Sequence, residues 1–200
     1  SFADFERRFG GLWEQSTMSY AVQQYFLHGG RDALIVRVSN GGAKAAISLP
    51  TASATLILEA ADEGDWGEAL RVAVDYNSKD PATLFNLTVE ELRAPGATEI
   101  VATETFRNLS MDATNSRFVT KVLGQQSQLV RVNTVTADRP LETGGYVAAA
   151  ANGDDGGDID DGRLTSAALQ SDRKGLYALD KADLFNLLCI PPLTRDKDVD

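Results

Sequence analysis

The chain has 200 residues, of which 43% are hydrophobic, and its formal net charge at pH 7 is −10. This size and composition are typical of a globular protein that buries a core of its own. The acidic balance argues against nucleic acid or an anionic membrane as the main partner, because both need clustered Lys and Arg. No run approaches the roughly 20 apolar residues of a membrane-spanning helix, and a single cysteine excludes an intrachain disulfide framework.

The chain opens with a pattern that predicts a helix over residues 1–9. Ser1 and Asp4 suit the capping box at its start, and three Phe side chains fall on one face. The glycine pair at 10–11 supplies a left-handed end.

A second helix is predicted over residues 17–28, with Ser16 or Thr17 as its cap and the glycine pair at 29–30 as its end. Its apolar stripe at helical spacing consists of Met18, Ala21, Val22, Tyr25 and Phe26. Residues 33–38 (ALIVRV) then form a nearly continuous apolar run, which predicts a strand covered on both faces.

The middle of the chain changes to alternating apolar and polar residues, the period of strands with one solvated face. Strands are predicted over 43–50, 55–60, 70–76, 84–93, 98–106 and 129–134, with a helix over 113–125. Residues 137–162 are irregular, and helical turns are predicted over 164–170 and 175–181. Residues 184–190 (LFNLLCI) form a second continuous apolar strand, which Pro191 and Pro192 end.

These elements predict a mixed α+β or α/β fold in two parts. Residues 1–53 and 136–200 form a discontinuous, small α/β layer built from both chain ends, in which strands 33–38 and 184–190 are sheet partners. Residues 54–135 form an inserted antiparallel β-rich domain.

Nucleophilic catalysis finds no support among the residues. His28 is the only histidine and follows a helix, where a charged or carbonyl-bonded ring has a structural role. Cys189 lies inside an apolar strand pattern, which predicts an inert buried thiol. No G-x-S-x-G, G-x-G-x-x-G or G-x-x-x-x-G-K-[ST] motif is present. We therefore expect no enzyme, and no catalytic or cofactor-binding residues.

The segment NGDDGGDIDDG, residues 152–162, is the one candidate for a metal site. Its hard oxygen ligands suit calcium, and they are Asp154, Asp155, Asp158, Asp160 and Asp161. An EF-hand frame starting at Asn152 places Arg163 where a bidentate Glu is needed, so a solvated loop and no metal are expected. A calcium- or glycan-binding β-rich module remains the alternative function, and a hydrolase with an unrecognised carboxylate pair is a third.

Two tryptophans, Trp13 and Trp66, each lie beside Gly and acidic residues. Either one could anchor an interface, because Trp is enriched at binding hot spots. Each could equally lie at the edge of a core.

The opening segments SFADFERRFGG and SYAVQQYFLHGGRDALIVRV resemble the start of the contractile tail sheath family of bacteriophages and related injection machines. The family patterns F-x-x-x-FG, A-V-x-x-F-F-x-N-G-G and x-x-x-V-V-R-V match residues 5–10, 21–30 and 34–38, with His28 where Asn is more usual. Four later segments are similar in order and spacing: AADEGDWGEALRVAV (60–74), ETFRNLS (104–110), SQLVRV (127–132) and GLYALDKADLFNLLCIPP (175–192).

The resemblance implies a structural subunit and not an enzyme. Sheath proteins polymerise as a helical tube around an inner tail tube, attach to baseplate proteins and contract to drive the tube through a target envelope. The implied partners are other copies of the chain, the tail tube protein and the baseplate, with no nucleic acid and no membrane anchor. The implied location is the virion tail, assembled in the host bacterial cytoplasm. Larger members carry a further C-terminal part with strand exchange, so the resemblance implies a fragment without that part.

Overall fold

The computed structural model describes residues 1–192 and contains both helices and antiparallel sheets, a mixed α+β fold. The chain divides into two compact units. The outer unit consists of Ser1–Asn40 with Asp158–Asp200, and the central unit of Gly41–Gly157. These units divide at 40/41 and 157/158, whereas the sequence predicts boundaries at 53/54 and 135/136. The difference arises because strand β1 (Ala46–Pro50) and parts of residues 139–155 bond to strands of the central unit.

The first two helices of the outer unit form as the sequence predicts. Helix α1 spans Phe2–Phe9 with the Ser1/Asp4 capping box and Gly10 in the left-handed conformation at its end. Helix α2 spans Thr17–Leu27, and the Ser16 hydroxyl accepts a hydrogen bond from the Met18 amide. The three Phe rings of α1 stack in sequence, with centroids 5.7 and 5.1 Å apart.

The rest of the outer unit is short helical turns and extended chain. Helices α4 and α5 span Asp161–Thr165 and Ala168–Asp172, and the 3₁₀ helix η2 spans Gly175–Lys181. The predicted helix over 164–170 is thus divided between α4 and α5, while the turn over 175–181 is confirmed.

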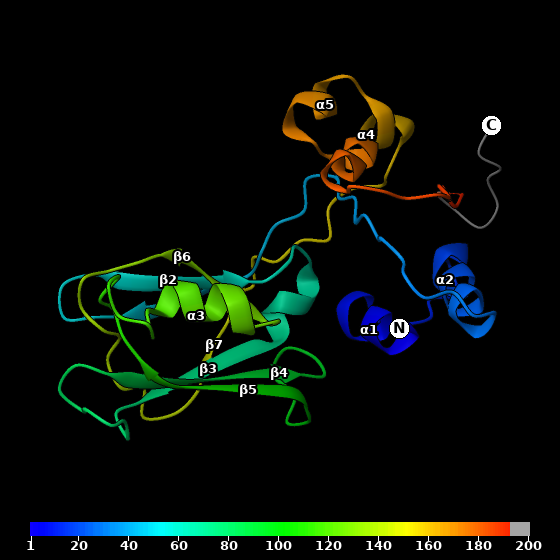
Figure 1. Cartoon of the computed structure of the whole chain (residues 1–200). Helices are drawn as coiled ribbons and strands as arrows, with labels where there is room; N and C mark the ends of the chain where they lie inside the picture. The colour runs from blue at the N-terminus through cyan, green and yellow to red at the C-terminus, as the bar shows by residue number, and fades with distance from the viewer. Residues whose placement is uncertain (193–200) are drawn as a thin grey trace. The chain divides into compact units, whose positions relative to one another are not determined.

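The central unit is built from two antiparallel sheets (Figure 1). One sheet has the order β1-β2-β6 and consists of β1 Ala46–Pro50, β2 Thr55–Ala60 and β6 Val130–Thr134. The other has the order β5-β4-β3-β7 and consists of β3 Leu70–Asp75, β4 Phe85–Leu92, β5 Ile100–Leu109 and β7 Val147–Ala148. The 3₁₀ helix η1, Asp65–Ala69, joins β2 to β3. The alternating segments of the sequence correctly predict strands β2 to β6. Strand β1 lies within the short strand predicted over 43–50, and β7 lies in the part predicted to be irregular.

Helix α3, Val119–Gln126, is shorter than the predicted helix over 113–125. Residues 112–117 instead form two turns closed by side chains. The Asp112 carboxylate accepts from the Thr114 amide at 2.8 Å, and the Asn115 side chain accepts from the Arg117 amide at 2.8 Å. Such side-chain bonds compete with the helical backbone pattern and delay its start.

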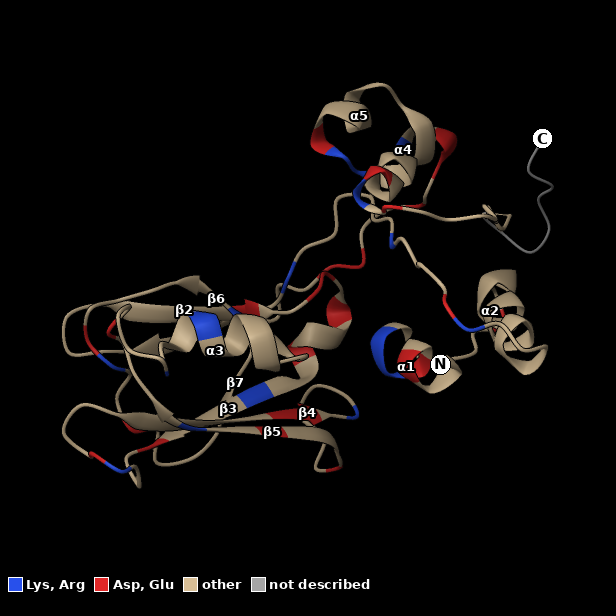
Figure 2. Cartoon of the chain, in the orientation of Figure 1, with Lys and Arg blue, Asp and Glu red and all other residues tan. Residues whose placement is uncertain are grey.

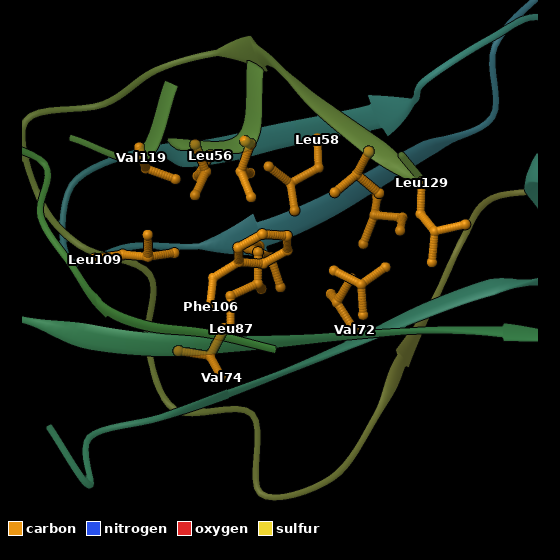
Figure 3. Packing of buried hydrophobic residues seen from close by; sticks show 14 of the residues in the cluster. Leu56, Leu58, Val72, Val74, Leu87, Phe106, Leu109, Val119 and Leu129 are labelled. Carbon is orange, nitrogen blue, oxygen red and sulfur yellow. The ribbon is translucent and has the colours of Figure 1, made fainter. Parts of the chain in front are cut away.

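The core lies between the two sheets and α3 (Figure 3). Alternate residues of each strand point inward, as the burial of Leu70, Val72 and Val74 along β3 illustrates. Of the hydrophobic residues that are buried in the described chain, all but Phe5 belong to the central unit. At about 25 cal/mol per Å² of buried apolar area, this layer is the main source of folding free energy.

One segment, residues 139–155, closes the same side of both sheets, and we call it the edge segment. It bonds to β1 through Leu141 N to Pro50 O at 2.8 Å and Ala150 N to Ala46 O at 2.8 Å. It bonds to β3 through Thr143 N to Val74 O at 3.2 Å, and β7 within it pairs with β3. Edge strands with unpaired backbone groups invite aggregation, so this segment protects β1 and β3 at once.

The α/β layer predicted from both chain ends is absent from the described residues. Residues 33–38 and 184–190 belong to no strand, and the outer unit contains no sheet within residues 1–192. The residues from Asp183 to Ile190 are all exposed, including Cys189, which the sequence predicts to be buried. A buried strand needs neighbouring strands on the same sheet, and the described residues of the outer unit form none.

We expect Leu58→Ala and Leu187→Ala to differ sharply in their effect on stability. Leu58 is fully buried, so its truncation should cost about 2–5 kcal/mol of unfolding free energy. Leu187 is 82% exposed, so the same change should stay within about 0.5 kcal/mol. Urea denaturation of the dilute protein measures both, and a comparable loss at Leu187 would contradict its exposure.

Candidate interaction surface

Exposed apolar side chains are concentrated in the outer unit. Of the seventeen large hydrophobic side chains exposed among the described residues, twelve lie there. They are Phe9, Leu12, Trp13, Tyr20, Tyr25, Leu27, Leu34, Leu184, Phe185, Leu187, Leu188 and Ile190. A small unit with one buried hydrophobic residue and this much exposed apolar surface is typical of a protein–protein contact region.

The most exposed of these residues lie in extended chain. Leu184 and Leu187 are 80% and 82% exposed, and Leu34 is 60% exposed. Residues 34–37 also line a groove of about 370 Å³ together with Ala178, Leu179, Lys181 and Ala182 of the same unit. Figure 1 shows the residues after η2 as an extended segment without a neighbouring strand. An apolar run of strand-forming residues that belongs to no sheet of its own chain is suited to pairing with another chain.

The apolar stripe of α2 has the same character. Met18, Val22 and Phe26 are half-buried, and Tyr25 is exposed with its hydroxyl donating to Asp32 O at 2.7 Å. A helix usually places its apolar stripe against a core, and the described residues cover this one only in part.

His28 has the structural role that its position predicts. It is the C-cap residue of α2, and its Nδ1 lies 2.8 Å from the carbonyl oxygen of Gln24. It is exposed, and the hydrogen bond of its ring joins it to the backbone of its own helix.

The acidic segment 152–162 is divided between the two units and holds no cluster of ligands. Asn152 Oδ1 accepts from Ala46 N at 3.0 Å, and Asp155 Oδ1 accepts from Asp65 N at 3.0 Å. Asp154 forms a backbone bridge with Ala43, while Asp160 is the N-cap of α4. Within residues 1–192, no three His, Cys, Asp or Glu side chains gather in a way that could hold a metal ion. These carboxylates and carbonyls therefore serve as hydrogen-bond acceptors for the loops.

The two tryptophans differ. Trp66 in η1 packs against the core of the central unit and donates its indole N–H to Glu63 O at 3.2 Å. Trp13 is 61% exposed in the outer unit. Of the two interpretations open from the sequence, Trp66 fits the core edge, and Trp13 is available for a contact.

The segment ETFRNLS at the end of β5 is used for structure throughout. Glu104 accepts from Ser127 Oγ at 2.6 Å and from Gln128 N at 2.7 Å, which holds the turn between α3 and β6. Asn108 has a φ of 55° and accepts from Lys79 N at 2.6 Å. Phe106 and Leu109 lie in the core. Glu104 and Asn108 thus bind backbone amides or a hydroxyl that the fold would otherwise leave unpaired.

A charged cluster on the outer face of the second sheet was not anticipated from the sequence. Glu90 in β4 is 7% exposed, pairs with Arg71 of β3 at 2.7 Å and accepts from the Tyr146 hydroxyl at 2.6 Å. The Arg71 guanidinium lies over the Tyr146 ring at 4.3 Å. Figure 2 shows a blue stretch in β3 beside the red of β4. The cluster fastens the edge segment to the sheet.

Burial opposes ionisation of Glu90, but the hydrogen bonds from Tyr146 and Arg71 outweigh it and hold the pKa of Glu90 below its usual value. The hydrogen bond to Glu90 raises the pKa of Tyr146 in turn. The alternation of residues 70–76 places Arg71 on the polar face, which is the one sequence signal for this cluster.

A hollow of about 630 Å³ lies among loops of the central unit, lined by residues that include Tyr76, Asp112, Asp138 and Arg139. Arg139 already donates to Pro81 O at 2.6 Å and Leu84 O at 2.9 Å, and it covers the Tyr76 ring at 3.6 Å. The lining contains no paired nucleophile and general base. It is a structural hollow in which the edge segment is anchored.

None of the helices in the described residues is long and apolar enough to cross a membrane. No protein-family model matches the chain, and no curated protein matches it. Its function must therefore be argued from its own residues.

The paired Glu90 carboxylate predicts acid sensitivity that Glu90→Gln should reduce. Because its folded-state pKa lies below the unfolded value of about 4.3, Glu90 stabilises the fold above that pH, and the contribution is lost as pH falls through the folded pKa. We expect Glu90→Gln to cost about 1.5–3 kcal/mol at neutral pH and clearly less near pH 3.

Denaturant melts at several pH values measure this difference, with Tyr146→Phe as a variant that removes one of the two partners and should fall between. Equal slopes of stability against pH in the parent and Glu90→Gln would show that the pair is not coupled to folding.

Proposed function

We propose that the chain is a structural subunit of a contractile phage-tail-like sheath, which polymerises around an inner tail tube and contracts to drive it through a target envelope. The observation that carries the proposal is the contrast between the units. The central unit has a complete core, while the described residues of the outer unit expose large apolar side chains on the helices and on two apolar segments that belong to no strand. A subunit of a polymer has this character, because neighbouring copies cover what one copy leaves exposed.

The motifs shared with the sheath family support the proposal by the roles that they have here. Segment 60–74 contributes η1 and the core strand β3, and segment 104–110 ends β5 and holds the turn before β6. The segments at 34–38 and 184–190 are apolar and belong to no strand. Within the described residues, the contacts shown for these segments are structural ones.

The partners that follow are other copies of the chain, an inner tail tube protein and baseplate proteins, and the location is a virion tail. Contacts between copies would use the exposed residues of 33–38 and 184–190 as added strands. Backbone hydrogen bonds would supply affinity in such a contact, and the alternate Leu side chains would supply specificity.

We expect Leu187→Asp to abolish assembly without unfolding the chain. A charge at a contact that becomes buried costs several kcal/mol, so the assembled fraction should fall at least roughly tenfold, which corresponds to about 1.4 kcal/mol. Sedimentation and negative-stain imaging of the full-length protein, expressed with its tail tube protein, measure the assembled fraction.

The matched control is Val135→Asp, because Val135 is 49% exposed in the central unit and is not part of the proposed contact. It should assemble like the parent. The sheath proposal fails if the parent never forms tubes or rings with its tail tube protein, or if both variants assemble equally well.

A calcium- or glycan-binding module is the alternative, and no described contact favours it, since the loop oxygens of 152–155 bond to backbone amides. We expect calcium to leave the thermal melt unchanged relative to magnesium. A site occupied at about 100 times its Kd would add about 2.7 kcal/mol of stability. A calcium-specific rise of that size would favour the alternative over the sheath.

A further inference from the structure

The chain contains two Asn-Gly pairs, at residues 40–41 and 152–153. Asn before Gly is chemically labile, because the next backbone nitrogen can attack the side-chain amide carbon and Gly has no side chain to obstruct the approach. The pairs lie near the two places where the chain passes between its units. Their surroundings differ.

In the pair at 152–153, both the Asn side chain and the Gly backbone nitrogen are held by hydrogen bonds. Asn152 Oδ1 accepts from Ala46 N at 3.0 Å, and Gly153 N donates to Glu68 Oε1 at 3.1 Å. The backbone of Gly153 is also tightly packed, since a Cβ there would lie 2.6 Å from Gly64 O. The attacking nitrogen is therefore engaged, and the side chain is fixed.

The pair at 40–41 is open. Gly41 is exposed, its amide donates no hydrogen bond to another described residue, and a Cβ built on it meets nothing within 4 Å. The Asn40 side chain makes one bond, from Nδ2 to Asp158 O at 2.7 Å. The attacking nitrogen is thus free to approach the side-chain carbon.

We infer that Asn40 is a site of spontaneous deamidation and that Asn152 is protected from it. In the first step the Gly41 nitrogen bonds to Cγ of Asn40, the Cγ–Nδ2 bond breaks, and ammonia leaves with the proton from the Gly41 amide. Water then opens the succinimide to aspartate or isoaspartate. One water is consumed, one ammonia is released, and nothing is oxidised or reduced.

The reaction removes the hydrogen bond between Asn40 and Asp158, which links the two segments that connect the units; we call this bond the tie. Asn40 ends the first part of the outer unit and Asp158 begins its second part, so their hydrogen bond joins the two points where the chain leaves and re-enters that unit. A carboxylate cannot donate to Asp158 O, and it adds a negative charge beside an acidic segment. Deamidation at Asn40 therefore releases this tie irreversibly, whatever the chain assembles with.

Peptide mass spectrometry of the full chain, held folded at mildly alkaline pH, tests the inference. Trypsin cleavage after Arg37 and Lys44 releases Asn40 in a short peptide, residues 38–44. Over days, we expect the mass of that peptide to rise by the difference between an OH and an NH₂ group. The peptide that contains Asn152 should keep its mass in the same sample. In denaturant both pairs should convert.

Equal conversion at both pairs in the folded protein, faster conversion at Asn152, or conversion of Asn40 only after unfolding would each overturn the inference.

The structural consequence is tested by limited trypsin cleavage at Arg37 and Lys44. We expect the cleavage rate of Asn40→Asp to be several-fold higher than that of the parent. Asn40→Gln keeps an amide donor, so trypsin should cleave it more slowly than Asn40→Asp. Asn133→Asp is the matched control, because Asn133 also donates through its amide, to Glu59 at 2.8 Å, within the central unit. Cleavage of Asn40→Asp at the parent rate would show that the bond to Asp158 does not tie the connections.

Discussion

The structure depends on one apolar layer, the contact between the two sheets and α3 of the central unit. Residues such as Leu58, Phe85 and Val119 are fully buried there, and nearly all buried hydrophobic residues of the described chain belong to it. Since burial of apolar surface is the dominant favourable term in folding, this unit has the means to fold by itself. Among the described residues of the outer unit, Phe5 is the one buried hydrophobic residue, so these residues contribute little burial of this kind.

Polar interactions of the central unit hold the segments that border this apolar layer in place. The edge segment pairs with β1 and β3, the Arg71–Glu90–Tyr146 cluster fastens it, and Arg139 anchors its start over Tyr76. Glu104 holds the turn into β6 in the same manner. Each of these groups binds a backbone or side-chain partner that would otherwise be unpaired, so these charged residues have a structural role.

The proposed function depends on the outer unit, because its described residues leave many apolar side chains exposed. Two helices with apolar faces and two strand-like segments have no adequate cover among residues 1–192. Exposed apolar surface of this extent is costly in water and is typical of a contact with another chain. That is the physical basis for proposing a subunit of a sheath.

Local patterns in the sequence determined the helices α1 and α2 with their caps, and the strands β2 to β6, because capping and alternation depend on residues close together in the chain. They also correctly assigned a structural role to His28. The start of α3 was missed because the side chains of Asp112 and Asn115 bond locally.

Only the tertiary structure decided where the units divide, how the edge segment joins two sheets, and that Arg71, Glu90 and Tyr146 meet, since these residues are far apart in sequence. It also decided the state of residues 33–38 and 184–190. An apolar run predicts a strand that is covered on both faces. Whether the same chain provides that cover depends on the whole fold. Here the described residues do not, and the outer unit is left open to a partner.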